Sequence, residues 1–146
     1  MSENGTAAEQ IQMPQHGEFC WTEIATTDLE ACKEFYTKIF DWNFQQSENS
    51  EIQMKYLEFG NADGRGFGGM YEMNAEMCGG TIPPPHFMNY IAVDDVDEAA
   101  SKAFDLGGRI VVPPMDIPQV GRFCVVEDPT GAKFSMIRLQ QPGGEK

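Results

Sequence analysis

Histidine is scarce in this chain, and basic residues are far outnumbered by acidic ones. The 146 residues include 2 histidines, and 23 acidic residues against 10 basic ones leave a formal net charge of −13. Such a charge repels phosphate backbones and anionic membrane surfaces. We therefore expect neither a nucleic acid nor a membrane as a partner.

Cysteines are few and irregularly spaced, and long hydrophobic runs are missing. Cys20, Cys32, Cys78 and Cys124 form no CxxC pair. Most of them lie in apolar runs, where a thiol behaves as a small hydrophobic group, so we expect all of them to be reduced. No apolar run approaches the roughly 20 residues that span a bilayer, and the N-terminus lacks the signal-peptide pattern. These absences predict a cytoplasmic protein.

The composition that remains suits one globular domain. Hydrophobic residues make up 41% of the chain and charged residues 23%, and a chain of this length can bury a core without disulfides. We expect a mobile N-terminal arm over 1–15, a single domain over 16–139 and a flexible tail over 140–146. Within the domain, glycines and three consecutive prolines in 74–85 predict a linker between modules at about 17–73 and 86–139.

The two modules begin alike. Phe19–Ala31 reads FCWTEIATTDLEA and Phe87–Ala99 reads FMNYIAVDDVDEA. Each segment starts with alternating strand-like residues, reaches Ile-Ala, and continues through acidic or hydroxyl residues into an amphipathic helical pattern. A whole module that recurs in this way indicates an internal repeat.

Both expected helices have N-terminal signals. Thr27 followed by Glu30 forms a capping box that predicts the start of the first helix. Asp94, with Asp97 in the equivalent position, predicts the start of the second, and Gly107 predicts its end.

Strand-like runs follow each helix, so that each half reads β-α-β-β-β and the fold class is α+β. These runs are Trp42–Gln46, Gln53–Phe59 and Phe67–Tyr71 in the first half, and Arg109–Val112, Arg122–Glu127 and Lys133–Leu139 in the second.

Several segments resemble one family in the right order. ATTDLEACKEFYTKIFDW, YIAVDDVDEA and VVEDPTGAKFSMI are similar to the vicinal oxygen chelate superfamily, which includes glyoxalase I, extradiol dioxygenases and bleomycin-sequestering (bleomycin resistance) proteins. The resemblance covers about 17–139, and DIPQVGRF resembles a subgroup related to the mycobacterial 27 kDa antigen. It implies two βαβββ modules that form a curved mixed sheet around a central cleft, with helices on the outer face.

Metal-dependent members of that family place His, Glu or Gln at four positions, one on each of four strands. By motif, the resemblance puts these positions on Trp21, Met88, Ser135 and Gly68 or Gly69. None of these residues suits the hard divalent ions of the family, which need several nitrogen or oxygen ligands. We therefore predict no metal and no other cofactor. The alternative is a shifted register, in which Glu23 and His86 converge on an ion with another donor.

The alternation of side chains along the strands, combined with the resemblance, also predicts a small-molecule site in the cleft. Glu23 is its most informative member, because it interrupts an apolar strand on the face assigned to the cleft. It is a candidate general base, or it pairs with a cation or a tyrosine hydroxyl. The alternative for the whole set is simple packing between the modules. The expected ligand-binding residues are Trp21, Glu23, Tyr71, Met88, Tyr90, Arg122, Ser135 and Ile137.

Two basic residues leave alternatives open. Arg122 could clamp a ligand carboxylate or phosphate, or pair with surface acids. His86 could titrate near neutral pH in the site, or lie exposed at the end of the linker.

The sequence favours a metal-independent protein that binds a small molecule in the cleft between the modules. The alternative is a lyase, isomerase or dioxygenase-type enzyme that uses Glu23 as a base or a metal in the shifted register. A third hypothesis is a non-catalytic interaction domain whose acidic surface attracts a basic partner. The resemblance is also compatible with a homodimer.

Overall fold

The computed structural model describes residues 13–47 and 55–140. The chain folds as two compact units. We call Cys20–Tyr90 with Lys133–Ser135 the Glu23 unit. We call the remainder, which includes Ile91–Ala132, the Arg122 unit. Most of the expected N-terminal arm and C-terminal tail lies outside the described residues.

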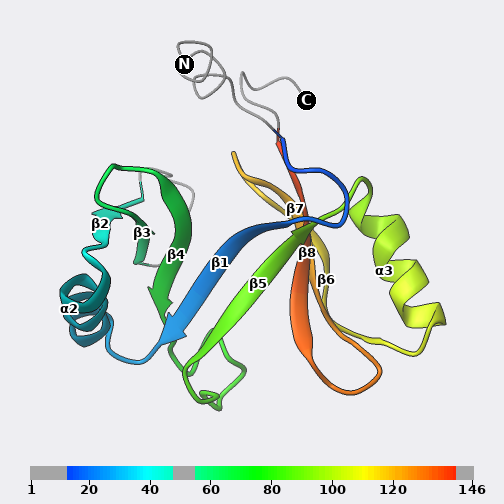
Figure 1. Cartoon of the computed structure of the whole chain (residues 1–146). Coiled ribbons are helices and arrows are strands. Elements are labelled where there is room, and N and C mark those ends of the chain that lie inside the picture. The colour runs from blue at the N-terminus through cyan, green and yellow to red at the C-terminus, as the bar shows by residue number, and fades with distance from the viewer. Residues whose placement is uncertain (1–12, 48–54, 141–146) are drawn as a thin grey trace, which may run out of the picture. The chain divides into compact units, whose positions relative to one another are not determined.

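The Glu23 unit contains one helix and most of the strands (Figure 1). Its hydrogen-bonded strands follow the order β2-β3-β4-β1-β5, and the start of β8 comes next. Strands β1 and β4 are parallel, whereas β2 and β3, and β3 and β4, are antiparallel. The elements are β1 Phe19–Thr26, α2 Leu29–Phe40, β2 Asn43–Gln46, β3 Tyr56–Gly60, β4 Gly66–Glu72 and β5 His86–Ala92.

The Arg122 unit repeats the pattern of a helix followed by three strands. Its strand order is β8-β7-β6, and β6 and β7 pair in the antiparallel sense with two register shifts. The elements are α3 Val96–Asp105, β6 Arg109–Ile117, β7 Gly121–Glu127 and β8 Lys133–Leu139. The predicted α+β class with β-α-β-β-β order in each half is therefore confirmed, with eight strands in a mixed sheet and two helices among the described residues.

Some predicted element boundaries were wrong by one or more residues. Asp28, not Thr27, caps α2, because its side chain accepts the backbone N–H of Ala31. Asp95, not Asp94, caps α3 in the same way. In both caps, an aspartate with an extended backbone accepts a hydrogen bond from a free N–H group of the first helical turn. The sequence offered two neighbouring candidates for this role at each helix. Strand β6 also runs beyond the predicted Val112 to Ile117, with its bulges accommodating two prolines.

The core of the Glu23 unit lies between α2 and one face of its strands. Ile24 of β1, Leu29 of α2 and Met70 of β4 are at most 3% exposed. Because side chains alternate along a strand, burial of Ile24 under α2 turns its neighbour Glu23 to the opposite face. The cluster comprises Ile24, Leu29, Leu57, Phe59 and Met70, with Cys32, Tyr36, Trp42 and Phe44 packed against it.

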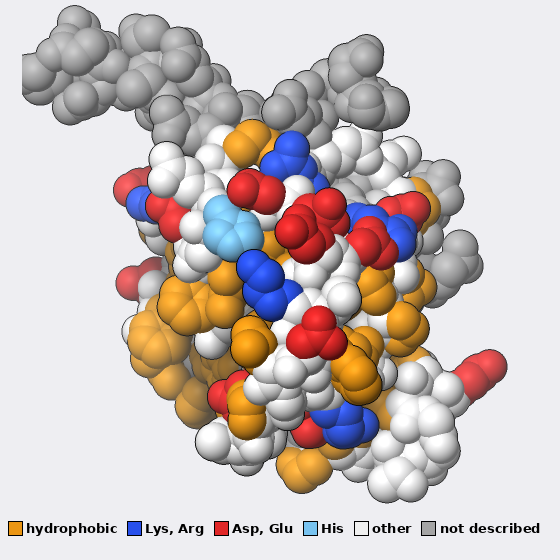
Figure 2. Space-filling model, turned by 90° about the vertical axis from the view of Figure 1, so that its right-hand side faces the viewer, with side chains coloured by type: hydrophobic (Ala, Val, Ile, Leu, Met, Phe, Trp, Pro, Cys, Tyr) orange, Lys and Arg blue, Asp and Glu red, His pale blue; other side chains and the backbone are white. Residues whose placement is uncertain are grey.

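The surface mixes charged and hydrophobic side chains. Figure 2 shows hydrophobic groups gathered between acidic and basic ones on the face it presents. Phe104 and Leu106, at the end of α3, are 66% and 72% exposed. All four cysteines are free thiols. None of the described helices is long and apolar enough to cross a membrane.

Candidate functional site around Glu23

Glu23 lies in the middle of β1, on the face that α2 does not cover. Glu23 is paired with Gly69 on β4, and Gly69 is paired in turn with Glu58 on β3. Paired residues share a face of the sheet, so neighbouring strands present their side chains around the Glu23 carboxylate.

Two tyrosine hydroxyls donate hydrogen bonds to this carboxylate. The Tyr56 hydroxyl lies 2.8 Å from Oε2 of Glu23, and the Tyr90 hydroxyl lies 2.9 Å from Oε1. The indole Nε1–H of Trp21 donates to the Tyr56 oxygen at 3.1 Å. These bonds form one connected network across β1, β3 and β5, and connected hydrogen bonds polarise and strengthen one another.

Gly69 makes room for this network. A Cβ built at Gly69 would lie 2.0 Å from the Tyr56 hydroxyl oxygen and 2.5 Å from Cε1 of its ring. Tyr56 therefore crosses directly over the glycine to reach Glu23. Gly68 serves the other face, since a Cβ there would lie 2.4 Å from Cζ of Phe59 in the core. The register that the sequence left open is thus resolved, with Gly69 on the Glu23 face and Gly68 on the core face.

Burial raises the pKa of Glu23 above its usual value of 4.5, and this effect exceeds the lowering by its hydrogen bonds. The Tyr56 and Tyr90 hydroxyls favour the carboxylate form, and so does the nearby charge of His86. No lysine or arginine among the described residues contributes to the stabilisation of the ionised form. Glu23 is thus a poorly solvated carboxylate held by neutral donors.

The tyrosines of the site remain protonated over the physiological range. Burial, followed by the negative charge of Glu23, raises the pKa of Tyr71 to about 12. The same two causes raise the pKa values of Tyr56 and Tyr90 still further. The hydroxyls of Tyr56 and Tyr90 are therefore permanent donors to Glu23.

Ser135 lies beside Tyr90 and is fully buried. Its hydroxyl helps to lower the pKa of Tyr90, yet no partner in the described part of the chain meets hydrogen-bond geometry with its Oγ. An unsatisfied buried hydroxyl is unfavourable by about 1–3 kcal/mol unless another group binds it. We use the name Glu23 cluster for Trp21, Glu23, Tyr56, Tyr71, Tyr90 and Ser135.

His86 and Met88 lie on the same face of β5 as Tyr90, because they precede it by four and two residues. His86 is partly exposed, and so is Met88. The His86 Nδ1 lies 2.8 Å from the carbonyl oxygen of Pro84. A hydrogen bond to this carbonyl oxygen requires a proton on Nδ1, and Nε2 is not engaged by Pro84. A place for His86 at the site stays a prediction.

The two remaining predicted ligand-binding residues belong to the Arg122 unit. Ile137 is buried at 4% exposure. The guanidinium of Arg122 is held by Asp97 at 2.8 Å and by Asp116 at 3.1 Å. These ion pairs match the alternative of a structural arginine, and a ligand-clamping role for Arg122 stays a prediction.

The profile of the Glyoxalase/Bleomycin resistance protein/Dioxygenase superfamily matches residues 19–136. The chain belongs to this superfamily. Its predicted resemblance to the vicinal oxygen chelate group, of which these proteins are members, is confirmed.

Among superfamily relatives, "Putative glyoxylase CFP32" of Mycobacterium bovis is 33% identical over 141 residues, which cover 85% of this chain and 48% of the relative. The anthracycline biosynthesis protein DnrV of Streptomyces peucetius is 26% identical over 134 residues, covering 81% of this chain and 46% of the relative. The chain therefore spans about half the length of the curated relatives it matches.

Solved structures share the superfamily fold. Methylmalonyl-CoA epimerase from Mycobacterium tuberculosis has a TM-score of 0.59 at 14% identity, covering 92% of this chain and 96% of the epimerase. A variant of homoprotocatechuate 2,3-dioxygenase from B. fuscum has a TM-score of 0.59 at 16% identity, covering 88% of this chain and 34% of the dioxygenase. At these identities the likeness concerns the fold alone.

The side chains at the four positions that the resemblance assigns to a metal do not fit a divalent ion. Trp21 uses its indole N–H as a donor to Tyr56, and Gly69 lies under the Tyr56 ring. Met88 offers a thioether, and Ser135 a neutral hydroxyl. The described residues contain no group of three His, Cys, Asp or Glu side chains arranged to hold a metal. The shifted register would need a third donor beside Glu23 and His86.

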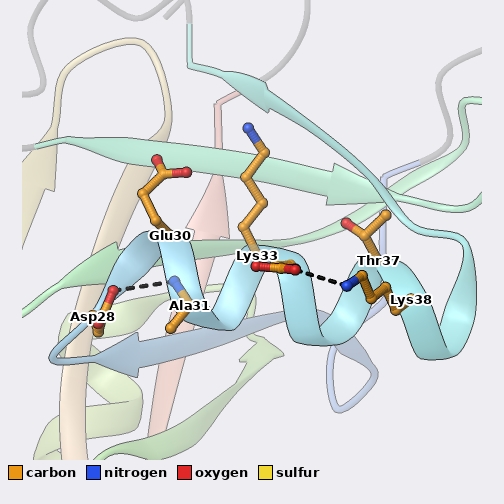
Figure 3. Close-up of a pocket in the computed structure, with 7 residues that line it drawn as sticks. Asp28, Glu30, Ala31, Lys33, Thr37 and Lys38 are labelled. Atoms are coloured by element: carbon orange, nitrogen blue, oxygen red, sulfur yellow. Dashed lines mark hydrogen bonds and ion pairs between the residues drawn. The ribbon is translucent and has the colours of Figure 1, made fainter.

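A second feature, an open hollow on α2, differs in character from the Glu23 cluster. It is lined by helix side chains, among them Glu30, Lys33 and Thr37. Figure 3 shows these side chains projecting from α2, with the ammonium of Lys38 bonded to Glu34 at 2.7 Å. Both partners of this ion pair are more than 60% exposed, so the hollow lies on the solvent-exposed side of α2. We therefore take the Glu23 cluster as the candidate functional site.

Tyr56 and Gly69 are site residues that sequence reasoning missed or left unassigned. Tyr56 fell within a predicted strand, Gln53–Phe59, whose face was not assigned, and residues 53–54 lie outside the described part of the chain. The available signal was the period of two combined with Gly69, because a glycine inside a strand often marks the close approach of another group.

Proposed function

We propose that this protein binds a small organic molecule at the Glu23 cluster without a metal ion. The carrying observation is the Glu23 carboxylate, a poorly solvated group. Its hydrogen-bond partners among the described residues are two tyrosine hydroxyls, and none of them is a basic side chain. Aromatic walls with a few convergent polar groups are typical of small-molecule sites. The partly exposed Trp21, Tyr71 and Met88 give a ligand access to the cluster.

A second candidate function is proton abstraction by Glu23, in a lyase, isomerase or dioxygenase-type reaction. The raised pKa of Glu23 favours this alternative, because a general base works best when its pKa lies near the working pH. His86, with Nε2 unused by Pro84, would be a second proton-transfer group.

A thermal-shift screen of the full-length protein in excess EDTA tests the binding function. A compound at about 100 times its Kd should stabilise the wild type by about 2.7 kcal/mol. The shift should disappear in Glu23→Gln and Trp21→Ala and persist in Glu34→Gln, a matched loss of charge on exposed α2. Failure to find any ligand whose shift depends on Glu23 would contradict the proposal.

The ligands found in this screen also separate binding from catalysis. If a ligand is converted and Glu23 is the base, Glu23→Gln should reduce kcat at saturating ligand by about 10²–10⁴-fold, in addition to any loss of affinity. Turnover that survives Glu23→Gln would exclude the base role.

We also propose that a second copy of this chain covers an apolar patch around α2. A homodimer is compatible with the family resemblance, and the patch would be buried in it. Exposed hydrophobic patches of this kind mark interaction sites. The patch comprises Phe35 (58% exposed), Ile39 (52%), Phe40 (51%), Phe67 (36%) and Phe87 (55%).

Sedimentation analysis tests the homodimer. The wild type and Thr37→Glu, a neutral-to-acidic change at an exposed position of α2, should sediment as dimers. Ile39→Glu should sediment as a folded monomer, because it places a charge in the apolar patch without disturbing the stacked rings. A monomeric wild type, or a dimeric Ile39→Glu, would refute this assembly.

A further inference from the structure

The Glu23 cluster contains two polar groups whose hydrogen-bonding capacity is not fully used by its own residues. The carboxylate of Glu23 receives one tyrosine hydroxyl on each oxygen, and a carboxylate oxygen has room for a further donor. The Ser135 Oγ, beside Tyr90, has no hydrogen-bond partner among the described residues although Ser135 is fully buried. A ligand that donates hydrogen bonds to both groups would satisfy them together.

Glu23 has only neutral hydrogen-bond donors among the described residues, which favours a positive ligand. Glu58 of β3 lies on the same face by register, and β4 contributes the neutral Tyr71. On β5, His86 is the basic group whose charge reaches Glu23. On β8, Lys133 shares the face of Ser135 by alternation, but it is exposed and does not contribute to the pKa of Glu23. Within the Glu23 unit, Lys38 and Lys55 pair with acids of α2.

The aromatic side chains add to this preference. Trp21, Tyr56, Tyr71 and Tyr90 come from different strands, β1, β3, β4 and β5, yet are grouped about one carboxylate. The faces of aromatic rings carry negative charge density and attract cations, and tryptophan does so most strongly. An ammonium group attached to an apolar or aromatic body therefore matches both the charge and the lining of the cluster.

We infer that the Glu23 cluster selects a small organic cation with at least one N–H donor, attached to an apolar or aromatic body, and that Glu23 and Ser135 accept from that ammonium group. The inference rests on the proposed binding function and names its ligand class. It excludes phosphate esters and carboxylates as preferred ligands.

Binding of such a cation is coupled to a proton. Where Glu23 is protonated in the free protein, the ammonium ion binds the carboxylate and the carboxyl proton passes to solvent, so charge and atoms balance. Affinity should then fall by up to tenfold for each pH unit below the pKa of Glu23 in the free protein. Above that pKa, affinity should become independent of pH until the ligand amine loses its own proton.

Three probes share an indole ring and differ in charge, so comparing them isolates the effect of ligand charge on affinity. Tryptamine is a cation at neutral pH, tryptophol is neutral, and indole-3-propionate is an anion. Calorimetric titration of the full-length protein should show tryptamine binding at least about tenfold more tightly than the other two, as a charge-assisted hydrogen bond implies. Titrations in two buffers of different ionisation enthalpy should detect proton release on tryptamine binding below the pKa of Glu23.

Variants assign the effect to residues. Glu23→Gln should remove the preference for tryptamine and the proton release, and Ser135→Ala should weaken tryptamine binding by about tenfold or less. Glu34→Gln should change neither quantity. Equal affinity for tryptamine in wild type and Glu23→Gln, or binding of tryptamine without proton release across the pH range, would overturn the inference.

The same measurements separate this inference from the proposed function. If indole-3-propionate binds more tightly than tryptamine and loses affinity in Lys133→Gln, the site takes anions, so the cation class is wrong while small-molecule binding stands. If no probe binds but the screen yields Glu23-dependent neutral or anionic ligands, the cation class again fails alone. If the screen also yields none, both proposals fail.

Discussion

Gly69→Ala is expected to lower the free energy of unfolding by about 3 kcal/mol. The new methyl group would stand 2.0 Å from the Tyr56 hydroxyl and 2.5 Å from the ring, and Tyr56 is only 9% exposed, so it has little space to move. Overpacking of this kind is destabilising by about 1–3 kcal/mol, and a lost hydrogen bond to a partly buried carboxylate adds about as much. Urea unfolding monitored by circular dichroism measures the change.

Gly66→Ala is the matched control on the same strand. A Cβ at Gly66 has 3.8 Å to the carbonyl oxygen of Phe59 as its nearest contact, so this variant should be within about 0.5 kcal/mol of the wild type or slightly more stable. In a double-mutant cycle, Gly69→Ala should cost little once Tyr56 is replaced by alanine, since the clash partner is gone. Equal destabilisation by the two glycine variants, or strict additivity with Tyr56→Ala, would contradict the account of Gly69.

Glu23→Gln is expected to change how stability depends on pH. Because the folded-state pKa of Glu23 is raised above 4.5, the folded chain takes up a proton at a higher pH than the unfolded chain. Glu23 therefore contributes stability that is complete below pH 4.5 and is lost as pH rises through the raised pKa. Relative to Glu23→Gln, the wild type should gain about 1.4 kcal/mol on acidification for each unit by which the pKa is raised.

Urea unfolding of both proteins from about pH 8 down to about pH 5 measures this difference, and the many other titrating acids cancel in the comparison. Glu34→Gln provides the contrast, because the exposed ion pair with Lys38 lowers the pKa of Glu34. If the free energies of unfolding of the wild type and of Glu23→Gln change equally with pH over the whole range, burial does not raise the pKa of Glu23.

Much of the fold was predictable because its signals are local. The alternation of Phe19–Thr26 and the helical spacing after Asp28 each follow from a few adjacent residues. The helix caps were wrong by one residue because consecutive hydroxyl and acidic residues, Thr27 with Asp28 and Asp94 with Asp95, offer equivalent oxygens. Backbone conformation, which selects between them, is set by how the preceding strand ends.

The site was less predictable, because it depends on pairing between distant strands. The period of two placed Trp21, Glu23 and Tyr90 on one face. Tyr90 bonds to Glu23 directly, whereas Trp21 is joined to Glu23 through Tyr56. No local sequence pattern predicts that Tyr56 lies over Gly69. That fact follows from the register of β3 against β4, which pairs Tyr56 with Tyr71 and Glu58 with Gly69.

The bond from the Trp21 indole to Tyr56 gives the protein an optical reporter of its own site. The emission of an indole depends on the groups around its N–H, and Trp21 is separated from the Glu23 carboxylate by a single hydroxyl. The other tryptophan, Trp42, is stacked on Phe59 with ring centroids 4.5 Å apart, on the core side of the strands. Occupancy and protonation at Glu23 can thus be followed by fluorescence from Trp21 without attaching a dye, with Trp42 as the internal reference.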